Sequence, residues 1–384
     1  MSSSRFLSAD EAVAILDVRK ATLYAYVSRG LVRSRAVAGS RHREYARTDV
    51  EALRSGKRAR RDPRAAARAV LGTKGLPVLQ SALTCIEGGR VFVRGHDLVA
   101  LADDHSFEDV VALLWGAWPD DVVPPRRARG TRGLPLLARL QQRLAEDDAR
   151  DPAARSLESA SARRVGAAVL RRMTAEVCQA PPSSDPIAHQ LAGAWGLSSP
   201  EPIDAALVLC SEHGLNVSAF TARCVASAGA SIPMAVSAGL GALSGRRHGG
   251  DTRNVAAMLD ASGSISRTIA RLVERDGVLP GFGHPLYPDG DPRAEALLRR
   301  CISGAVRRRS GRFVEAARRE LGVLPNLDFG LVTLCRSLGA PSDAPWALFA
   351  LGRTAGWVAH ALEQWATGSL IRPRAEYVGP PPHG

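Results

Sequence analysis

The stretch PGFGHPLYPDGDPR, residues 280–293, decides how the rest of the chain is interpreted. It interrupts segments whose apolar residues recur with helical spacing, and it is dense in proline, glycine and aspartate. These residue types favour turns over helix interiors, so the stretch predicts an irregular loop between two helices. His284 and Arg293 stand within it, which marks this loop as a candidate functional site.

Three other stretches place polar groups inside otherwise apolar helical sequence. They are CSEHGLNVSAF at 210–220, GRRHGG at 245–250 and PNLDF at 325–329, and they add His213, Asn216, His248 and Asp328 as candidates. Taken alone, His213 could be a structural histidine at a helix end, and Asp328 an ordinary helix cap. Cys210 and His213 have CxxH spacing, but no second pair accompanies them, so we expect no metal site.

The remaining sequence predicts helices and very little sheet. From residue 71 onward only 87–95 is typical of a hairpin. Apolar residues recur with helical period over 107–118, 134–144, 161–177, 202–210, 219–228, 234–243, 255–259, 265–273, 293–306, 312–321, 329–338 and 346–367. We find no fixed-period repeat, so the predicted fold class is a large all-α domain and not a solenoid.

The first 54 residues have a different pattern. They predict helices at 8–16, 21–29 and from 48, the first opened by the capping-box spacing of SADE at 8–11, and a basic hairpin with strands at 31–35 and 41–45. This arrangement resembles the winged helix-turn-helix units of the MerR and excisionase type, through LSADEAVAIL, ATLYAYVSRGL and SRHREY. The resemblance implies DNA contact through the second helix and the wing, with Arg19, Lys20, Arg33, Arg35, Arg41 and Arg43 as candidate contacts. The alternatives are a basic module that has lost DNA binding, or one that mediates self-association.

The charge is distributed unevenly along the 384 residues. There are 51 Lys and Arg against 38 Asp and Glu, a net charge of +13, and residues 1–64 hold +8 of it. A nucleic-acid-binding appendage on a near-neutral domain has this distribution. Residues 55–70 are polar and Arg-rich and predict a linker. With 45% hydrophobic residues, the chain as a whole is not of the disordered class.

Three sequence features bear on location. No basic start followed by an apolar run opens the chain, so we expect no secretory signal peptide. The uncharged stretch 224–245 has the length of a membrane span, but its Gly, Ser and Pro content favours close-packed helices broken near Pro233. The six cysteines form no CxxC pair and no cluster, as is typical of free thiols in a reducing compartment. We therefore expect a cytoplasmic protein without a membrane partner.

The order of the four polar stretches resembles that of the citrate synthase family. Its members carry a DHxxN(A/V)S element, an HGG element, a PGfGHp(l/v)Y…DPRa element and an NvDf element, and the similarity runs from residue 72 to residue 379. The resemblance implies the all-α citrate synthase fold at 71–384, with a small helical subdomain at 250–338. It also implies a homodimer that condenses acetyl-CoA and oxaloacetate with water to give citrate and CoA. The CoA thioester is then a substrate, and no cofactor is implied.

By motif match, the resemblance assigns the catalytic roles. Asp328 is the base that takes a proton from the thioester methyl group, and His248 donates a hydrogen bond to the thioester carbonyl. His284 polarises the ketone of oxaloacetate. We expect His248 to be a neutral imidazole, because a site with several arginines disfavours a further cation.

The same match implies the binding residues. Arg293, Arg353 and Arg372 hold the carboxylates of oxaloacetate, because guanidinium forks bind carboxylates bidentately, and Arg372 reaches into the site of the partner subunit. The remaining residues with an implied role are His213 and Asn216 in the same pocket, and Gly281 and Gly283 against CoA.

The sequence departs from the family pattern at two places. Asp251 follows His248-Gly-Gly where many members have alanine, and we expect its carboxylate to raise the pKa of His248. Residues 118–202 match poorly and lack an HPM element. Two alternative functions stay open: a 2-methylcitrate synthase using propionyl-CoA, since one methyl group is worth only ~1–3 kcal/mol in a pocket, and a DNA-binding regulator whose synthase-like domain senses a metabolite.

Overall fold

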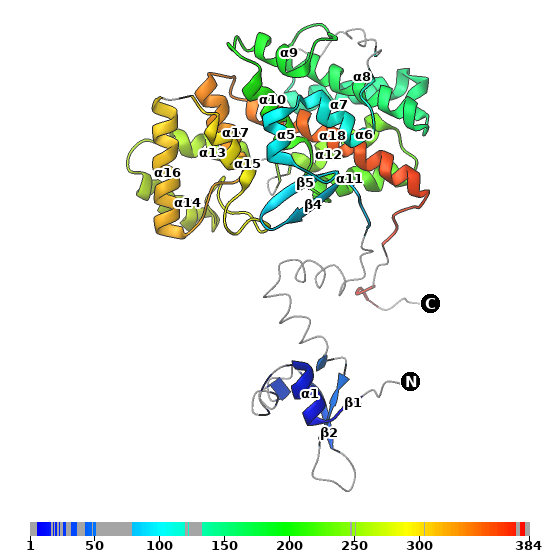
Figure 1. Ribbon diagram of the computed structural model, residues 1–384, viewed down its shortest axis with the longest axis vertical. Helices are drawn as coiled ribbons and strands as arrows, with labels where there is room; N and C mark the ends of the chain where they lie inside the picture. The colour runs from blue at the N-terminus through cyan, green and yellow to red at the C-terminus, as the bar shows by residue number, and fades with distance from the viewer. Residues whose placement is uncertain are drawn as a thin grey trace. The chain divides into compact units, whose positions relative to one another are not determined.

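The computed structural model describes residues 6–16, 18, 20, 23, 26–27, 32–36, 43–47, 49–50, 79–119, 122, 133–245, 248–249, 251–302, 304–373 and 377–380. Two compact units divide the chain: residues 1–80 together with 372–384, and residues 81–371 (Figure 1).

The first unit contains a small antiparallel sheet and one described helix. Strands β1 (Phe6–Leu7), β2 (Ser34–Ala36) and β3 (Arg43–Ala46) pair in the order β1-β3-β2. Helix α1 (Ala9–Leu16) begins with the predicted capping box, in which Ser8 N donates to Glu11 Oε2 at 2.7 Å and Glu11 N donates to Ser8 Oγ at 3.3 Å. The basic hairpin is confirmed in β2 and β3, whereas β1 was not predicted. The helices expected at 21–29 and from 48 lie largely outside the described residues.

The second unit begins with the predicted hairpin and continues as helices. Strands β4 (Thr84–Glu87), β5 (Arg90–Val93) and β6 (His96–Asp97) pair antiparallel in that order. The helices that follow are α5 (Leu98–Asp104), α6 (Phe107–Trp115), α7 (Leu136–Arg150), the short 3-10 helix η1 (Pro152–Arg155), α8 (Ser159–Cys178), α9 (Ile187–Ala194), α10 (Glu201–Ser211), α11 (Val217–Ser227), α12 (Ile232–Leu243), α13 (Asp251–Asp260), α14 (Ile265–Asp276), α15 (Pro292–Arg299), α16 (Ala305–Leu321), α17 (Leu327–Leu338) and α18 (Ala344–Thr367). The all-α prediction for this unit is confirmed.

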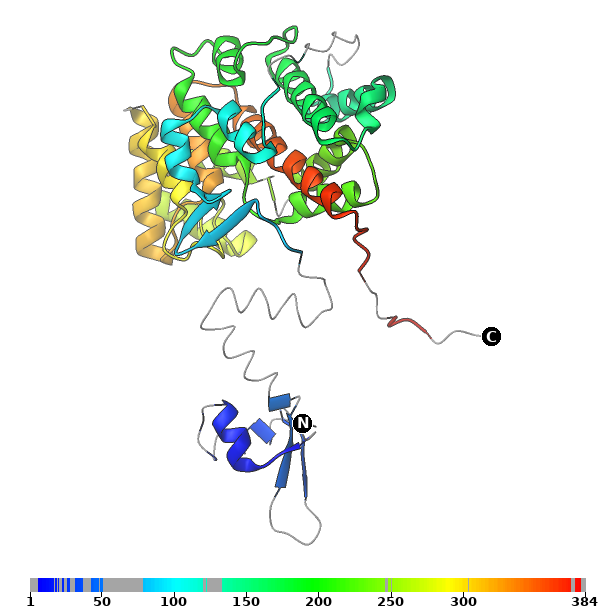
Figure 2. The same ribbon diagram turned by 45° about the vertical axis from the view of Figure 1, so that its right-hand side comes forward.

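Helix α18 runs through the middle of the second unit and is buried along most of its length (Figures 1 and 2). Glycines let neighbouring helices approach it closely. A Cβ added at Gly352 would lie 2.6 Å from the carbonyl oxygen of Leu207 in α10, and one at Gly356 would lie 2.6 Å from that of Ser211. Because side chains at these two positions would push α10 away, the glycines fix the distance between α10 and α18.

A second, smaller core lies beside the main one. Buried residues of α13, α14, α16 and α17 form it, including Val255, Leu272, Phe313 and Phe329. These helices gather on one side of the unit in both ribbon views (Figures 1 and 2). Helices α15 and α17 contribute side chains to the main core as well, among them Leu297 and Leu331. The segment between α13 and α17 is therefore anchored to both cores.

Some predicted boundaries are wrong. The single helix expected over 293–306 is two helices, because α15 ends at Arg299 and α16 begins after Gly304, whose φ of 153° is not helical. Helices α5 and α9 were not predicted, since each is too short to show a helical period. The break near Pro233 is confirmed: α11 ends at Ser227, and Pro233 lies in the first turn of α12. Among the described residues, no helix combines the length and apolar character that crossing a membrane requires.

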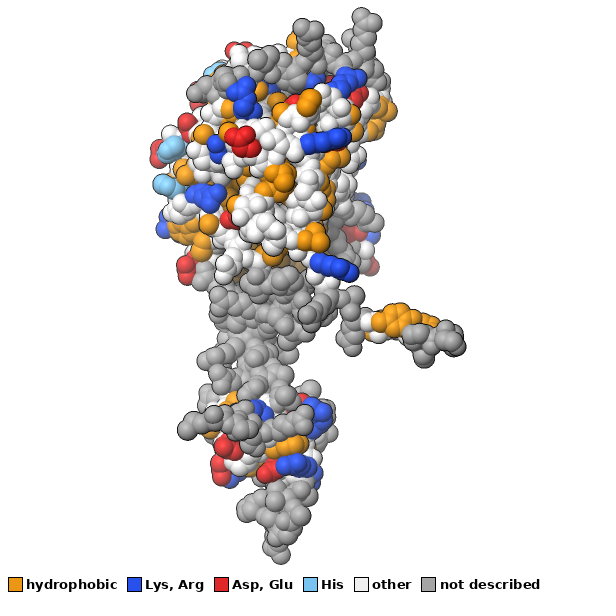
Figure 3. Space-filling view, turned by 90° about the vertical axis from the view of Figure 1, so that its right-hand side faces the viewer, with side chains coloured by type: hydrophobic (Ala, Val, Ile, Leu, Met, Phe, Trp, Pro, Cys, Tyr) orange, Lys and Arg blue, Asp and Glu red, His pale blue; other side chains and the backbone are white. Residues whose placement is uncertain are grey.

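Charged side chains of both signs are mixed on one face of the helical unit (Figure 3). On the face seen in Figure 3, basic side chains lie scattered among acidic and apolar ones. Such a mixed surface is ordinary for a folded domain, so the charge asymmetry of the sequence is carried mainly by the first 64 residues.

Candidate active site

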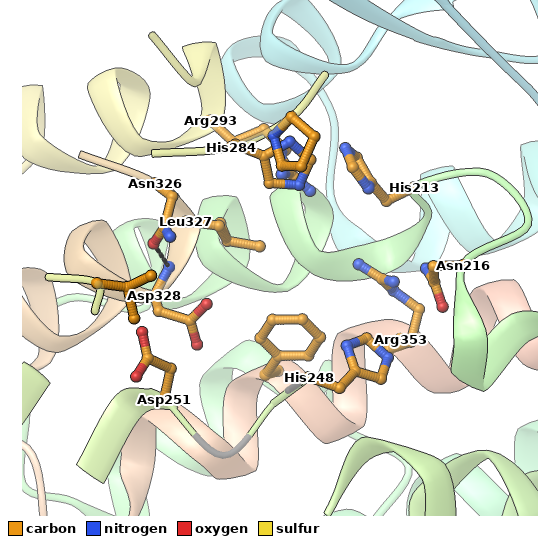
Figure 4. A pocket seen from close by; sticks show the side chains of 13 residues that line it. His213, Asn216, His248, Asp251, His284, Arg293, Asn326, Leu327, Asp328 and Arg353 are labelled. Atoms are coloured by element: carbon orange, nitrogen blue, oxygen red, sulfur yellow. Dashed lines mark hydrogen bonds between the residues drawn. The ribbon is translucent and has the colours of Figure 1, made fainter. Parts of the chain in front are cut away.

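One cavity of about 420 Å³ brings together residues from all four polar stretches (Figure 4). Its lining includes His213, Asn216, His248, Asp251, His284, Arg293, Asn326, Leu327, Asp328, Phe349 and Arg353. A cavity of this size suits a small-molecule ligand. Seven predicted residues share it, although the chain separates the first from the last by 140 positions.

His248 lies in the turn before α13 and is oriented by α11. Its Nε2 is 2.7 Å from Ser218 Oγ, and Ser218 Oγ is 2.9 Å from Asn216 Oδ1. Burial lowers the pKa of His248 to about 4, and the Arg353 guanidinium adds to this effect. The expectation of a neutral imidazole is therefore supported, whereas the expectation that Asp251 raises this pKa is wrong.

His284 has its tautomer set by the backbone. The amide of Leu286 donates to His284 Nδ1 at 3.2 Å, so in the neutral ring the proton lies on Nε2. Burial lowers the pKa of His284 to about 4, and Arg293 adds to this effect, while Asp291 opposes it. His284 is thus an uncharged donor at neutral pH.

His213 is held next to His284. Its Nε2 lies 2.7 Å from the hydroxyl of Tyr287, and its ring meets the His284 ring edge to face at a centroid distance of 5.2 Å. Burial holds the pKa of His213 well below its usual value, and Arg293 and Arg353 add to this effect. His213 therefore has a hydrogen-bond partner and also lines the cavity, so its role in binding stays a prediction.

Arg293 is fixed by a buried carboxylate. Asp291 accepts hydrogen bonds from Arg293 Nε at 3.0 Å and Arg293 Nη2 at 2.8 Å, and both residues are at most 3% exposed. Asp291 Oδ2 also accepts from the amide of Leu327, at 3.1 Å. One carboxylate therefore ties this arginine to the start of α17, where Asp328 lies.

Arg353 is held differently. It lies on α18 in the GRTAG segment at 352–356, is 1% exposed, and donates from Nε to the carbonyl oxygen of Cys210 at 2.8 Å. Glu212 lies near enough to oppose the lowering of the Arg353 pKa that burial causes. The Glu212 carboxylate is itself fully buried and lies 3.3 Å from His360 Nε2.

Asp328 is a carboxylate prepared to accept a proton. It occupies the first turn of α17, and its amide donates to Asn326 Oδ1 at 3.1 Å. Its Oδ1 is buried and has no hydrogen-bond partner among the described residues. Burial raises the pKa of Asp328 to about 7, the nearby Asp251 adds to the rise, and Arg293 opposes it. A carboxylate of this kind is a stronger base than a solvated one.

Three predicted residues lie outside the cavity lining. Gly281 has a φ of 76°, and a Cβ there would approach Val255 Cγ2 to 2.6 Å, so packing alone requires glycine at this position. Gly283 has a φ of 74° and open space around it. Arg372 follows α18 and is exposed. The roles of Gly281, Gly283 and Arg372 stay predictions.

Among the described residues of the first unit, three of the predicted DNA contacts are paired with acids. Arg33 donates to Asp49 through Nε and Nη2, Arg35 pairs with Glu44 at 2.8 Å, and Lys20 lies 2.6 Å from Asp10. Arg43 Nε donates to Ser34 Oγ at 3.1 Å. The other two predicted DNA contacts, Arg19 and Arg41, lie outside the described residues.

Besides the lining residues Asn326, Leu327 and Phe349, three residues that contact predicted site residues were not predicted. Ser218 is buried against His248, Asp291 holds Arg293, and Tyr287 contacts His213. All three stand inside the polar stretches or directly after them, yet nothing in the sequence alone shows which side chain each would meet. A buried polar residue needs a hydrogen-bond partner. A polar residue within an apolar segment is therefore the one sequence signal that could have pointed to these three residues.

Family models match both parts of the chain. Residues 128–374 match the model described as citrate synthase, C-terminal domain, and residues 7–62 match the model described as MerR HTH family regulatory protein. The second match supports the helix-turn-helix interpretation of the first unit.

Individual relatives agree with the first of these matches. A citrate synthase of Haloferax volcanii is 30% identical over 363 residues, which cover 80% of this chain and 95% of that protein. A 2-methylcitrate synthase of Corynebacterium glutamicum is 33% identical over 220 residues, covering 52% of this chain and 57% of its own length. Among solved structures, a citrate synthase from Thermotoga maritima has a TM-score of 0.67 and 25% identity, covering 82% of this chain and 96% of its own.

Proposed function

This chain belongs to the citrate synthase family, and on that premise we propose that it condenses acetyl-CoA with oxaloacetate and water to give citrate and CoA. Enzymes of this type perform an acyltransferase-like condensation in which the CoA thioester is a substrate and no cofactor is needed. The observation that supports the proposal most directly is that one carboxylate of raised pKa and two neutral imidazoles face one cavity beside two buried arginines.

Proton removal falls to Asp328 in this proposal. The unpartnered Oδ1 takes a proton from the thioester methyl group, and the raised pKa makes that transfer less unfavourable. The enolate oxygen needs a hydrogen-bond donor at the same moment. The hydroxyl of Ser218 donates to Asn216 Oδ1 in the structure; His248 supplies the donor from Nδ1 once that hydroxyl turns its proton to His248 Nε2 and leaves Asn216 Oδ1 to the amide of Ala219.

The new carbon–carbon bond then forms at the ketone of oxaloacetate. His284 donates to the ketone oxygen from Nε2, the nitrogen that carries the proton in its neutral form. Arg293 and Arg353 bind the two carboxylates, and the buried, unpartnered Nδ2 of Asn216 offers one further donor among the described residues. Water hydrolyses the resulting thioester and releases CoA.

The experiment is CoA release by the purified full chain, measured with a thiol reagent, with oxaloacetate and either acetyl-CoA or propionyl-CoA. We expect turnover with both and a preference for acetyl-CoA of roughly 10-fold or more, the usual effect of one methyl group. Faster turnover with propionyl-CoA would favour the 2-methylcitrate synthase instead. Binding of oxaloacetate without CoA release from either thioester would refute the enzyme.

A homodimer is part of the proposal, because the family resemblance places Arg372 in the neighbouring site. Arg372→Ala and Asp328→Asn subunits can be mixed and allowed to exchange. If sites are shared, each mixed dimer regains one intact site, and activity recovers to on the order of a quarter of wild type. No recovery despite confirmed subunit exchange would show that Arg372 does not act across an interface.

DNA binding by residues 1–54 is a second proposed function, supported by the family match over residues 7–62 and by the net charge of +8 on residues 1–64. The pairing of Arg33 and Arg35 with carboxylates reduces the free charge that this module presents. We expect a DNA mobility shift that weakens steeply with salt and disappears when residues 1–60 are removed. A shift that survives this truncation would refute the assignment.

The six free cysteines support a cytoplasmic location.

A further inference from the structure

Asp251 occupies a position that the proposed mechanism does not use. It opens α13 directly after His248-Gly-Gly, and its side chain lines the cavity. Its Oδ2 accepts a hydrogen bond from the amide of Gly281 at 2.7 Å, and its Oδ1 accepts one from Asn254 Nδ2 at 3.3 Å. The carboxylate is therefore held in place from two directions.

The amide that Asp251 binds belongs to a turn that is connected to Asp328. The amide of Asn326 donates to the carbonyl oxygen of Gly281 at 2.9 Å, and the amide of Gly283 donates to that of Leu324 at 2.8 Å. Asn326 Oδ1 then accepts from the amide of Asp328. A continuous series of hydrogen bonds thus runs from the carboxylate of Asp251, through Gly281 and Asn326, to the residue that carries the proposed base.

The two carboxylates also lie side by side. Figure 4 shows Asp251 and Asp328 on the same side of the cavity, each at the N-terminal end of its helix, which favours negative charge. Other charged or titratable groups surround Asp328. Asp291, Arg293 and Cys210 of α10 interact with it electrostatically, and the same cavity is lined by His284, by His248 from the turn before α13, by His213 from the turn after α10 and by Arg353 from α18.

We propose that Asp251 is a positioning residue for Asp328: it anchors the Gly281 turn, which is hydrogen-bonded to Asn326 before α17, and it places a second carboxylate beside the base. This inference deepens the proposed condensation and rests on it. Like charges in a shared cavity oppose simultaneous ionisation, and the Asp251 carboxylate accordingly adds to the raised pKa of Asp328. The benefit is a stronger base, and the cost is loss of the active form in acid.

Two variants distinguish the hydrogen bond that Asp251 accepts from Gly281 from the negative charge that it places beside Asp328. Asp251→Asn keeps an oxygen that can accept from the Gly281 amide but removes the charge. Asp251→Ala removes both. Asp289→Asn is the matched control, because Asp289 is an exposed carboxylate on the loop that follows Gly281, and its loss changes the net charge equally.

The test is a carboxyl ¹³C titration of the full chain labelled at aspartate Cγ, with the Asp328 signal assigned by its absence in Asp328→Asn. We expect the signal to titrate near neutral pH in the wild type and about one pH unit lower in Asp251→Asn. Asp289→Asn should leave it in place, and Asp251→Ala should in addition speed hydrogen exchange at the Gly281 amide. An Asp328 signal that titrates at the same pH in Asp251→Asn as in the wild type would overturn the proposal.

This measurement needs no turnover, so it separates two kinds of failure. If the wild type releases no CoA while the Asp328 signal shifts as expected, the proposed condensation fails and the coupling between the carboxylates stands. If the chain is active, the acid limb of kcat/KM should move with the signal in Asp251→Asn. An acid limb that stays in place would show that the coupling does not reach the reaction.

Discussion

The two walls of the cavity use charge in opposite ways. The wall built on α10, α11 and α18 presents His213, Asn216 and Arg353, with Ser218 of α11 in contact with His248, and carries no carboxylate among the residues that line the cavity. The wall built from residues 251–328 presents Asp251 and Asp328 and holds its arginine, Arg293, against Asp291. In the proposed mechanism each wall supplies one arginine for the anion, and only the second wall supplies the base.

The largest loss of activity should come from a substitution in the second wall, at Asp328. In Asp328→Asn we expect kcat to fall by roughly 10²–10⁴-fold, the range for loss of a general base. Burial raises the pKa of Asp328 from 3.8 to about 7, so the folded state loses stability as pH rises from about 4 to about 7, and the full penalty is present at pH 8. The neutral amide should therefore give a Tm at pH 8 no lower than that of the wild type. A variant that keeps a tenth of wild-type kcat would remove Asp328 from the role of base.

The two arginines should respond differently to the same change. Arg353→Lys loses a guanidinium fork that is held by one backbone carbonyl, and we expect KM for oxaloacetate to rise by roughly 10–100-fold with Tm almost unchanged. Arg293→Lys also disrupts the buried pair with Asp291, so KM for oxaloacetate should rise and Tm should fall. Equal losses of Tm in the two variants would contradict the difference between the walls.

The pH dependence of kcat/KM should reflect only the ionisation of Asp328, which belongs to the second wall. Because Asp328 must be ionised to act as a base, kcat/KM should rise by about tenfold between pH 6 and pH 8, with an apparent pKa near 7. The pKa values of His248 and His284 lie at about 4, so both rings stay neutral across this range and add no second limb. The measurement is kcat/KM from pH 5 to 9, and an acid limb centred near pH 4 would be inconsistent with this arrangement.

The smallest loss of activity should come from a substitution of Ser218, which contacts His248 from the first wall. Ser218→Ala removes the hydroxyl that fixes the tautomer of His248, and we expect kcat to fall a few-fold to about tenfold, the worth of one neutral hydrogen bond. KM for oxaloacetate should not change, because Ser218 is not proposed to touch it. Thr221→Ala is a suitable control, since Thr221 lies on the same helix and bonds only to the backbone at Val217 among the contacts described. An equal loss in both variants would point to damage to α11 as a whole.

Local patterns predict most of this fold. Apolar residues of helical period identify α10 to α14, and Pro233 correctly separates α11 from α12. The boundary between α15 and α16 was missed, because the sequence keeps enough apolar residues to suggest one helix, although α15 ends at Arg299 and Gly304, with its positive φ, precedes α16. Short helices such as α9 have too few turns for a period to appear.

The site is predicted less completely, for a physical reason. Motifs identify His248 and Asp328, but the partner of each polar group depends on which elements pack together. Asp251 illustrates this limit: it is close to His248 in sequence, yet as the first residue of α13 it turns towards Gly281 and Asp328. Ser218 and Asp291 were missed for the same reason, since each acts through a contact across the fold.

The shared carboxylate of Asp291 has a consequence for redesign. Because it holds Arg293 with one set of bonds and the first residue of α17 with another, the span between the anion-binding guanidinium and the proton acceptor has a fixed length. To bind a longer or shorter oxo acid, the backbone that joins Arg293 to α17 would have to change. A longer acyl chain would not disturb the hydrogen bonds of Asp291. Choice of electrophile and choice of nucleophile can therefore be altered separately.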